Sequence, residues 1–378
     1  MFTFNLKFIC HIIEFKVLKK IKCNSYTVEA GNLELSSFPA LLEESYKDVR
    51  KVIVVDENTH DFCLEYLLTA FPTLEEAEVI LLPTGEENKV MEVCFQVLEA
   101  LSEYGIVRSD LIITLGGGVV SDMGGFIASI YKRGLQCIHI PTSLLGMVDA
   151  ALGGKTGIDL GSYKNQIGTF HDPVAVYVDQ RFLATLPEEE WKSGFAEVLK
   201  HALIADAKEW ERLIGSKQDE LFSEENVKKI LEKSIAIKAK VVTEDPTEKG
   251  KRKSLNFGHT IGHAIEGYYL ELHPMSHGNC IALGMIAEAY LSNQKGTLPA
   301  DELNEIVQVM MALYPCPEDL LTGVGLMLEL MKNDKKNDQQ GVRMCFLDKI
   351  GECSWNHLID ENELKAAFNY LYQAYYKN

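Results

Sequence analysis

Short runs of apolar residues alternate with longer helical segments over roughly residues 50 to 140. The runs cover residues 52–55, 79–82, 111–115 and 137–140, and a further run covers residues 174–178. Each run is apolar on successive positions, which is typical of strands buried on both faces of a parallel sheet. A helical pattern over residues 88–104 supplies one covering helix. The pattern therefore predicts an α/β arrangement around a parallel sheet.

The pattern changes after Leu186-Pro187, where long helical stretches with few β-branched runs begin. This change predicts an α/β domain over residues 25–186 and a second, mainly α-helical domain over residues 187–378. Near the end, residues 342–347 and 351–355 predict a small hairpin, and residues 361–375 predict a closing helix. Residues 1–24 form an N-terminal extension: an extra strand, a loosely ordered segment, or the product of a start codon assigned too far upstream.

Composition narrows the functional classes. The chain has 378 residues, 47% hydrophobic content and a net charge of −18. We do not expect such an acidic chain to have nucleic acid or an anionic membrane as its main partner. Lysines interrupt the apolar residues of the first 22 positions, so no membrane-spanning segment or signal peptide is expected there. Nine single cysteines, without a C-x-x-C pair, favour reduced thiols and a cytoplasmic location.

Three histidines lie close together in the helical half of the chain. His259 and His263 are four residues apart, so both rings share one face if the segment is helical. His277 lies just beyond this expected helix, near enough to fold back. The spacing indicates an open, catalytic zinc site that a further imidazole or a carboxylate would complete. The alternative is a pair of buried core histidines.

A carboxylate for that site is available on another apolar helix. Glu197 and Lys200 lie three residues apart in a mostly apolar segment, where unpaired charges would be costly to bury. Glu197 is the natural carboxylate partner for the histidines. The competing interpretation is a salt bridge within an ordinary helix.

A glycine-rich turn follows the predicted strand at residues 111–115. It reads Gly-Gly-Gly-Val-Val-Ser-Asp from Gly116 and opens a helix, as a turn that binds a dinucleotide pyrophosphate would. The match to G-x-G-x-x-G is incomplete because the sixth position is Ser121, so an ordinary tight turn is the alternative. Asp56 and Asn58 follow an earlier strand and are candidates for ribose hydroxyls, but an acid before the glycines is not the common fingerprint.

Two lysines stand beside small residues further along. Lys155 lies within Gly-Gly-Lys-Thr-Gly, which is not a nucleoside-triphosphate loop because Asp149 occupies the position of the required first glycine. Lys164 precedes Asn165 nearby. In an acidic chain, both lysines are candidates for binding an anionic ligand, and a solvated turn lysine is the alternative for each.

These segments, with others in the same order, resemble the 3-dehydroquinate synthase family over roughly residues 50 to 355. The further motifs are Gly85-Glu86 with Lys89, Tyr131-Lys132-Arg133-Gly134, residues 141–145, Lys164-Asn165, residues 182–187, Lys238-Ala239-Lys240, Arg252, residues 256–263, His277-Gly278 and Asp334-Lys335-Lys336. One departure is Asn279, where the family usually has an acidic residue. That change affects the surroundings of His277 rather than the histidine itself.

The resemblance implies a Rossmann-like parallel-sheet domain that binds NAD and a mainly α-helical domain that binds metal and substrate. Zinc, or cobalt, would be held by Glu197, His259 and His277, which leaves His263 for the substrate. The implied NAD contacts are Asp56, Asn58, Glu86, Lys89, Gly117, Gly118, Val119, Asp122, Thr142, Ser143, Asp149, Lys155, Lys164, Phe182, Thr185 and Leu186. The implied catalytic and substrate-binding residues are Lys155, Lys164, Asn165, Lys200, Lys238, Arg252, Asn256, His263, the Lys335-Lys336 pair and, reaching toward a neighbouring subunit, Arg133.

The family activity implied is conversion of 3-deoxy-D-arabino-heptulosonate 7-phosphate to 3-dehydroquinate and phosphate in the shikimate pathway. It proceeds by transient oxidation with NAD, phosphate elimination, reduction and intramolecular aldol closure, and the enzyme is expected to be a homodimer. Within the superfamily, the alternatives are another sugar-phosphate cyclase and a zinc- and NAD-dependent glycerol-type dehydrogenase. Arg252, Lys238 and Asn256 favour a carboxylate-bearing substrate over both. An inactive nucleotide-binding or scaffold protein is the alternative from another class.

Overall fold

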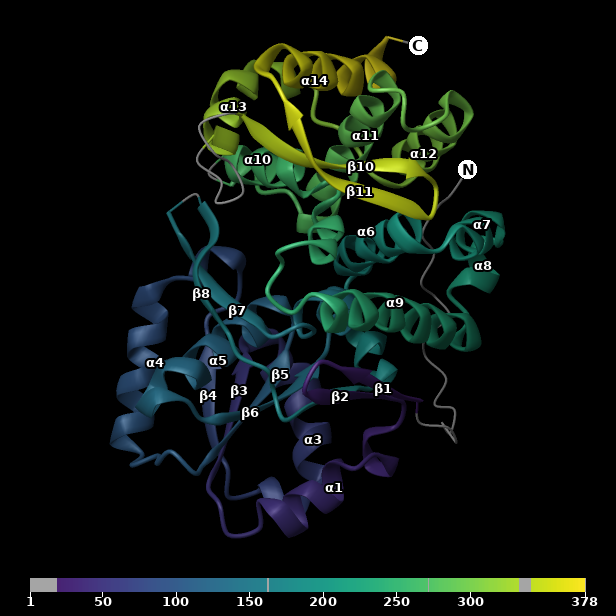
Figure 1. Cartoon of the computed structure of the whole chain (residues 1–378). Coiled ribbons are helices and arrows are strands. Elements are labelled where there is room, and N and C mark those ends of the chain that lie inside the picture. The colour runs from purple at the N-terminus through teal and green to yellow at the C-terminus, as the bar shows by residue number, and fades with distance from the viewer. Residues whose placement is uncertain (1–18, 162, 271, 333–340, 378) are drawn as a thin grey trace.

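The computed structural model describes residues 19–161, 163–270, 272–332 and 341–377 (Figure 1). Among these residues, seven strands form one sheet, and its inner strands are parallel. In spatial order the strands are β1 (Lys19–Cys23), β2 (Tyr26–Ala30), β9 (Ala175–Val178), β6 (Gln136–Pro141), β5 (Leu111–Gly116), β3 (Lys51–Asp56) and β4 (Glu78–Leu82). The strands predicted from the apolar runs are therefore confirmed.

Side chains of the central strands pack alternately on the two faces of this sheet. Val52 and Val54 belong to the apolar cluster formed with α4 (Met91–Glu103) and α5 (Gly118–Ile130). Ile53 and Val55 belong to the cluster on the other face. The short helices of the first half are α1 (Phe38–Ala40), α2 (Glu57–Thr59) and α3 (Glu65–Ala70). Burial on both faces explains why the strand sequences are continuously apolar.

Two hairpins lie outside the predicted strand set. β1 pairs antiparallel with β2, so the end of the predicted extension is an edge strand, whereas residues 1–18 lie outside the described residues. β7 (Lys155–Leu160) pairs antiparallel with β8 (Tyr163–Phe170), where the sequence indicated only a glycine-rich turn. Most of β8 is only partly buried, so it has no continuous apolar run to predict it.

The second half is mainly helical, as predicted, and lies above the sheet in Figure 1. Its helices are α6 (Glu188–Ala205), α7 (Ala207–Gly215), α8 (Gln218–Leu221), α9 (Glu224–Glu244), α10 (His259–Tyr269), α11 (His277–Gln294), α12 (Ala300–Leu313), α13 (Val324–Lys332) and α14 (Glu361–Tyr376). The predicted hairpin is β10 (Val342–Lys349) with β11 (Glu352–Ile359). The exact domain limits remain a prediction. Within the described ranges, no helix is both long and apolar enough to cross a bilayer.

His139 of β6 is a buried core histidine that makes stability depend on pH. One ring nitrogen, Nδ1, lies 2.7 Å from the Thr114 hydroxyl, and burial lowers the pKa of His139 to about 4. In the unfolded chain the ring binds a proton below about pH 6.5. The unfolded state therefore binds more protons between pH 6.5 and 4, and stability falls as the pH falls through this window.

We expect this histidine to account for about 3 kcal/mol of stability that is present above pH 6.5 and lost by pH 4. Urea unfolding at a series of pH values checks it by comparing the wild type with His139→Gln, whose stability should lack this part of the pH dependence. His60→Gln, at an exposed histidine, is the control. Parallel pH profiles for wild type and His139→Gln would contradict the prediction.

Candidate active site

A cleft of about 1120 Å³ lies between the sheet and the helical half. Its walls include residues at or just past the carboxyl ends of β3, β4, β5 and β6 together with residues of α6, α9, α10 and α11. The carboxyl ends of parallel strands are where open α/β sheets bind ligands. The volume is at the upper end for a small-molecule site, which suits a dinucleotide and a second ligand together.

This cleft brings most of the predicted site residues together. Every residue predicted for NAD lines it, as do Asn165, Lys200, Lys238, Arg252, Asn256, His259, His263 and His277. Glu197 is fully buried behind the cleft wall, beside the histidines. Arg133 is exposed in the turn η6 (Tyr131–Arg133) and does not line the cleft of its own chain. Lys335 and Lys336 lie outside the described residues.

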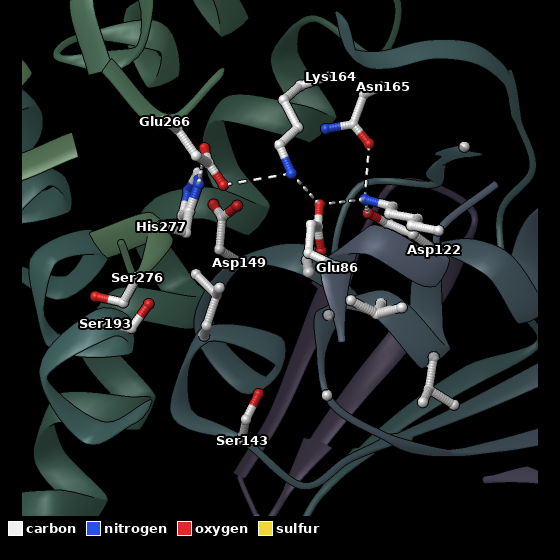
Figure 2. Close-up of a pocket in the computed structure, with 18 of the residues that line it drawn as sticks. Glu86, Asp122, Ser143, Asp149, Lys164, Asn165, Ser193, Glu266, Ser276 and His277 are labelled. Atoms are coloured by element: carbon white, nitrogen blue, oxygen red, sulfur yellow. Dashed lines mark hydrogen bonds and ion pairs between the residues drawn. The ribbon is translucent and has the colours of Figure 1, made fainter. Parts of the chain in front are cut away.

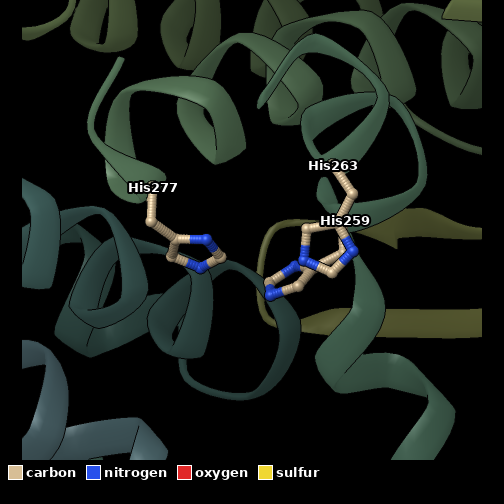
Figure 3. A group of neighbouring side chains, drawn as sticks. All are labelled: His259, His263 and His277. Carbon is tan, nitrogen blue, oxygen red and sulfur yellow. The ribbon is translucent and has the colours of Figure 1, made fainter. Parts of the chain in front are cut away.

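The three histidines face one another (Figure 3). His259 and His263 lie one turn apart on α10, and His277 is the first residue of α11. Their ring centroids are 5.1, 5.6 and 5.8 Å apart, and ring nitrogens from all three lie within 4.8 Å of one another. The predicted helix and the predicted return of His277 are both present.

Glu197 completes a set of ligand atoms with metal-site spacing. Its Oε1 lies 3.5 Å from Nε2 of His259 and 3.6 Å from Nε2 of His277. Two ligands bound about 2.1 Å from a tetrahedral zinc ion lie roughly 3.4 Å apart. Oε1 of Glu197 accepts no hydrogen bond from a described residue, whereas Oε2 contacts the Lys200 ammonium. The residues therefore fit a divalent metal, which Glu197, His259 and His277 would hold.

A second acidic group nearby fits a cation less well. Asp149 and His201 also lie near Glu197, with ligand atoms within 4.8 Å of one another. The ammonium of Lys238 is 2.6 Å from Asp149, and that of Lys200 contacts the second oxygen of Glu197. Two fixed positive charges already balance these acids, so the histidine group is the better metal site.

The Lys200 ammonium also sets the charge of Glu197. Both side chains are almost completely buried, and they are three residues apart on α6. Burial favours the neutral acid, but the attraction of Lys200 outweighs it and holds the pKa of Glu197 below its ordinary value. Glu197 is thus a carboxylate ready to bind metal, as its predicted role requires.

Close helix packing brings these ligands together. At Gly278, beside the predicted ligand His277, an added Cβ would lie 2.2 Å from the carbonyl oxygen of Ser193 on α6. At Gly284, an added Cβ would lie 2.0 Å from the carbonyl oxygen of Gly258, which precedes α10. Only glycine permits these approaches, so α11 can touch both helices that carry the other predicted ligands.

We expect Gly278→Ala to weaken metal binding about tenfold or more and to cost about 1 to 3 kcal/mol of stability, because α11 must move away from α6. Chelator competition and urea unfolding would measure the two effects. Gly325→Ala on α13 is the matched control, because an added Cβ there meets no atom within 4 Å. Metal affinity equal to that of the control would contradict the prediction.

The sheet side of the cleft presents backbone amides to an anion. α5 begins after Gly117, which provides no side-chain cap, and its first turn contains no acidic residue. Asp56, at the end of β3, caps the short helix α2 through Thr59 and also lines the cleft. This arrangement suits a pyrophosphate at the helix N-terminus and ribose hydroxyls near Asp56.

A network of buried lysine and acidic side chains lies in the cleft (Figure 2). Lys89 Nζ lies 2.6 Å from Asp122 and 2.8 Å from the side-chain oxygen of Asn165. Lys164 Nζ lies 2.9 Å from Glu86 and 3.2 Å from Asp159. Burial opposes both positive charges, but the surrounding acids raise the pKa of each lysine above its ordinary value. Both lysines are therefore charged across the physiological range.

Further cations line the helical side. Arg252 is 2% exposed and donates hydrogen bonds to the carbonyl oxygens of Pro246 and Gly153. Its Nε has no partner, and no described carboxylate lies within ion-pair distance of it. Lys155 contacts Glu248, which also accepts a hydrogen bond from Asn256. A buried guanidinium without an acidic partner is prepared for an anionic ligand.

Comparison with known proteins identifies the family. The sequence profile of the 3-dehydroquinate synthase N-terminal region matches residues 79–193, and that of the C-terminal region matches residues 194–337. The 3-dehydroquinate synthase of Parabacteroides distasonis is 35% identical over 332 residues, which span 88% of this chain and 94% of that protein. The chain belongs to the 3-dehydroquinate synthase family.

Solved structures of related synthases share the fold of this family member. One is a 2-deoxy-scyllo-inosose synthase complexed with carbaglucose-6-phosphate, NAD⁺ and Co²⁺: it is 25% identical, has a TM-score of 0.79, and the match covers 94% of this chain and 99% of that one. Another is the 2-epi-5-epi-valiolone synthase of Streptomyces hygroscopicus subsp. jinggangensis 5008 with NAD⁺ and Zn²⁺. It is 28% identical, has a TM-score of 0.78, and the match covers 93% and 98% of the two chains. The predicted fold class is thus confirmed.

Sequence patterns did not indicate every charged group in and around the cleft. Glu266 lines it, and its Oε2 lies 3.2 Å from Nδ1 of His277. Glu266 follows His259 by seven residues, so helical spacing alone was a signal that they share a face. The sequence positions of Asp159 and Glu248 gave no comparable indication that they lie near the cleft. The side chain of Asn279 donates a hydrogen bond to the carbonyl oxygen of Pro315. The departure from the family pattern at this position therefore leaves the contact between His277 and Glu266 in place.

Proposed function

We propose that this chain converts 3-deoxy-D-arabino-heptulosonate 7-phosphate to 3-dehydroquinate and phosphate. The observation that supports this most strongly is the buried Arg252, which has no acidic partner among the described residues and lines the same cleft as the proposed metal ligands. A substrate that bears a carboxylate supplies the missing negative charge. Membership of the family supports the same reaction.

The residues fit one divalent metal and one NAD, and both related structures that contain NAD⁺ also contain Co²⁺ or Zn²⁺. Glu197, His259 and His277 would hold the metal, and the residues around the N-terminus of α5 would hold NAD. When bound, these groups supply Lewis acidity at a substrate hydroxyl and reversible hydride transfer. The protein binds and orients: the ring centroid of His263 lies 5.1 Å from that of His259, and His263 also lines the cleft.

The surrounding cations would position the substrate. Arg252 would bind the carboxylate, with Asn256 alongside, and Lys155, Lys164, Asn165 and Lys238 would bind the other anionic and polar groups. Several of these side chains contact protein acids, and an anionic substrate would compete for them. Fixed cations that align a phosphate for elimination lower the barrier by orientation and by stabilising the leaving charge.

The alternatives are enzymes of the same fold. A sugar-phosphate cyclase whose substrate has no carboxylate would leave Arg252 buried without a counter-charge. A glycerol-type dehydrogenase would also leave Arg252 without a counter-charge. Its neutral polyol substrate has no negative charge for the other cations of the cleft to bind. An inactive scaffold has no need to keep the metal-ligand geometry together with these cations.

The deciding assay measures phosphate release from 3-deoxy-D-arabino-heptulosonate 7-phosphate by metal-stripped protein. NAD and zinc are added alone and then together. We expect release only when both are present, without net accumulation of NADH absorbance, because the hydride returns within the reaction. Steady NADH production with glycerol, and no phosphate release, would instead assign the chain to the dehydrogenases.

We further propose a homodimer in which Arg133 serves the cleft of the neighbouring subunit. Its exposed position in the turn η6, outside its own cleft, supports this arrangement. A test is to mix two inactive variants, Arg133→Ala and Lys200→Met, after unfolding and refolding them together. In a two-fold dimer, roughly a quarter of the sites in a random mixture would have neither defect, and activity should return. No recovery would contradict action across the subunits.

A cytoplasmic location stays a prediction. Eight of the nine cysteines are among the described residues, and none of these eight forms a disulfide, which supports a reducing compartment.

A further inference from the structure

Glu266 lies between the proposed metal site and the ammonium network of the cleft (Figure 2). It is a nearly buried carboxylate on α10, and its two oxygens have different partners. Oε2 lies 3.2 Å from Nδ1 of His277, the nitrogen on the far side of the ring from the proposed metal position. Oε1 lies 3.5 Å from the ammonium of Lys164, which comes from β8 in the other half of the chain.

Lys164 is shared among three acids. Besides Glu266, its ammonium contacts Glu86 and Asp159. Lys89 holds Asp122 and is 3.7 Å from Glu86. Four carboxylates therefore share two ammoniums in this network. The contacts connect a metal ligand to the loop after β4 and to α5, both of which are on the dinucleotide side.

We propose that Glu266 is a positioning residue that His277 and Lys164 share, and that this sharing makes the metal and an anion bound to Lys164 raise each other's affinity. The proposal rests on the proposed metal ligands. Glu266 is not proposed as a metal ligand. It acts through its contact with the proposed ligand His277.

The first step is orientation of the metal ligand. A carboxylate that accepts a hydrogen bond from Nδ1 of a histidine fixes the tautomer that leaves Nε2 free for the metal, and it increases the electron donation of the ring. Nε2 of His277 is the nitrogen that faces Glu197. Glu266 thus favours the form of His277 that the proposed site requires.

The second step is competition for Lys164. An anion that accepts hydrogen bonds from this ammonium draws it away from Oε1 of Glu266. The negative charge of Glu266 is then less neutralised, and its interaction with His277 strengthens. A stronger partner at Nδ1 makes His277 a better ligand, so the anion tightens metal binding. Because binding free energies are reciprocal, the metal tightens anion binding by the same factor.

The test measures Co²⁺ and Zn²⁺ affinity by chelator competition, with and without sulfate as the anion probe, and records the Co²⁺ absorption spectrum. We expect Glu266→Gln to weaken metal binding about tenfold or more, the usual effect of removing such a partner. We expect sulfate to tighten metal binding by the wild type about fivefold, at the low end of allosteric coupling, and to have little effect on the variant.

Two controls separate coupling from simple charge effects. Glu189→Gln removes an exposed carboxylate that also lines the cleft, and it should keep the wild-type metal affinity and the wild-type sulfate response. Lys164→Gln should tighten metal binding when no anion is present and abolish the sulfate response. It should have no further effect on metal affinity when combined with Glu266→Gln. Lys164→Gln also tests the proposal if Glu266→Gln does not fold.

Failure of the proposed function, of the positioning role and of the coupling would each give a different result. If the wild type binds no stoichiometric metal, the proposed function is wrong. If it binds metal and Glu266→Gln binds it equally well, the positioning role is wrong. A sulfate effect of the same size in both proteins means that the anion acts on the metal directly, which overturns the coupling.

Discussion

Replacing His277 with alanine is expected to remove stoichiometric metal and to lower the rate of phosphate release about a thousandfold. The substitution deletes one of three proposed ligands. In the wild type, Nε2 of His277 lies 3.6 Å from Oε1 of Glu197. A Lewis acid at the reacting hydroxyl contributes several kcal/mol to the barrier, and each 1.36 kcal/mol is a tenfold change in rate. Metal analysis of the purified protein and the phosphate-release assay measure the two losses.

His60→Ala is the matched control for this experiment. His60 is an exposed histidine beside Asp61, and its removal should change neither metal content nor rate. Retention of both metal and activity by His277→Ala would make the ligand assignment wrong. Loss of activity with full metal content would move His277 from the metal to the substrate.

The second large effect is expected at Glu288, a fully buried carboxylate of α11. Its oxygens accept hydrogen bonds from the backbone amides of Gly258, at 2.9 Å, and Thr260, at 3.2 Å. These amides lie at the N-terminus of α10, whose first residue is His259. Removing a buried acceptor leaves each amide unsatisfied at a cost of about 1 to 3 kcal/mol, and a cavity adds to it. We expect Glu288→Ala to lower the free energy of unfolding by about 4 kcal/mol.

Urea unfolding followed by circular dichroism measures this loss, and chelator competition should show weaker metal binding because His259 is less firmly held. Glu99→Ala on the exposed face of α4 is the control and should change stability by less than about 0.5 kcal/mol. Glu288→Gln keeps one acceptor oxygen and should recover about half of the lost stability. A change at Glu288→Ala no larger than that of the control would show that the hydrogen bonds from these amides to Glu288 are dispensable.

Much of the fold was predictable because its signals are local. The strands β3, β5, β6 and β9 are buried on both faces, so their sequences are continuously apolar and stand out from the helices. The edge strand β4 is also an apolar run, although Leu81 is exposed. The β7–β8 hairpin was not predicted. It extends from the sheet toward α10, most of its second strand is only partly buried, and its glycines are needed for close pairing with the neighbouring strand.

The candidate site divides in the same way. Residue types and spacing indicated a histidine site, a glycine-rich turn at a helix N-terminus, and lysines for anions. They did not divide the roles of His259, His263 and His277; only the family resemblance assigned His277 to the metal and His263 to the substrate. The structure brings all three rings together, so the division of roles between His263 and His277 stays a prediction for the variants above to test.

By itself, the sequence determined that this is an acidic α/β and helical chain of the 3-dehydroquinate synthase family, with the residue types for metal, dinucleotide and anion binding. Only the tertiary structure decided which charges meet. Glu197 reaches His277 because Gly278 lets α11 touch α6, and Glu266 divides its oxygens between His277 and Lys164. Such pairings depend on how separate helices and strands pack, and spacing along one segment carries no record of that packing.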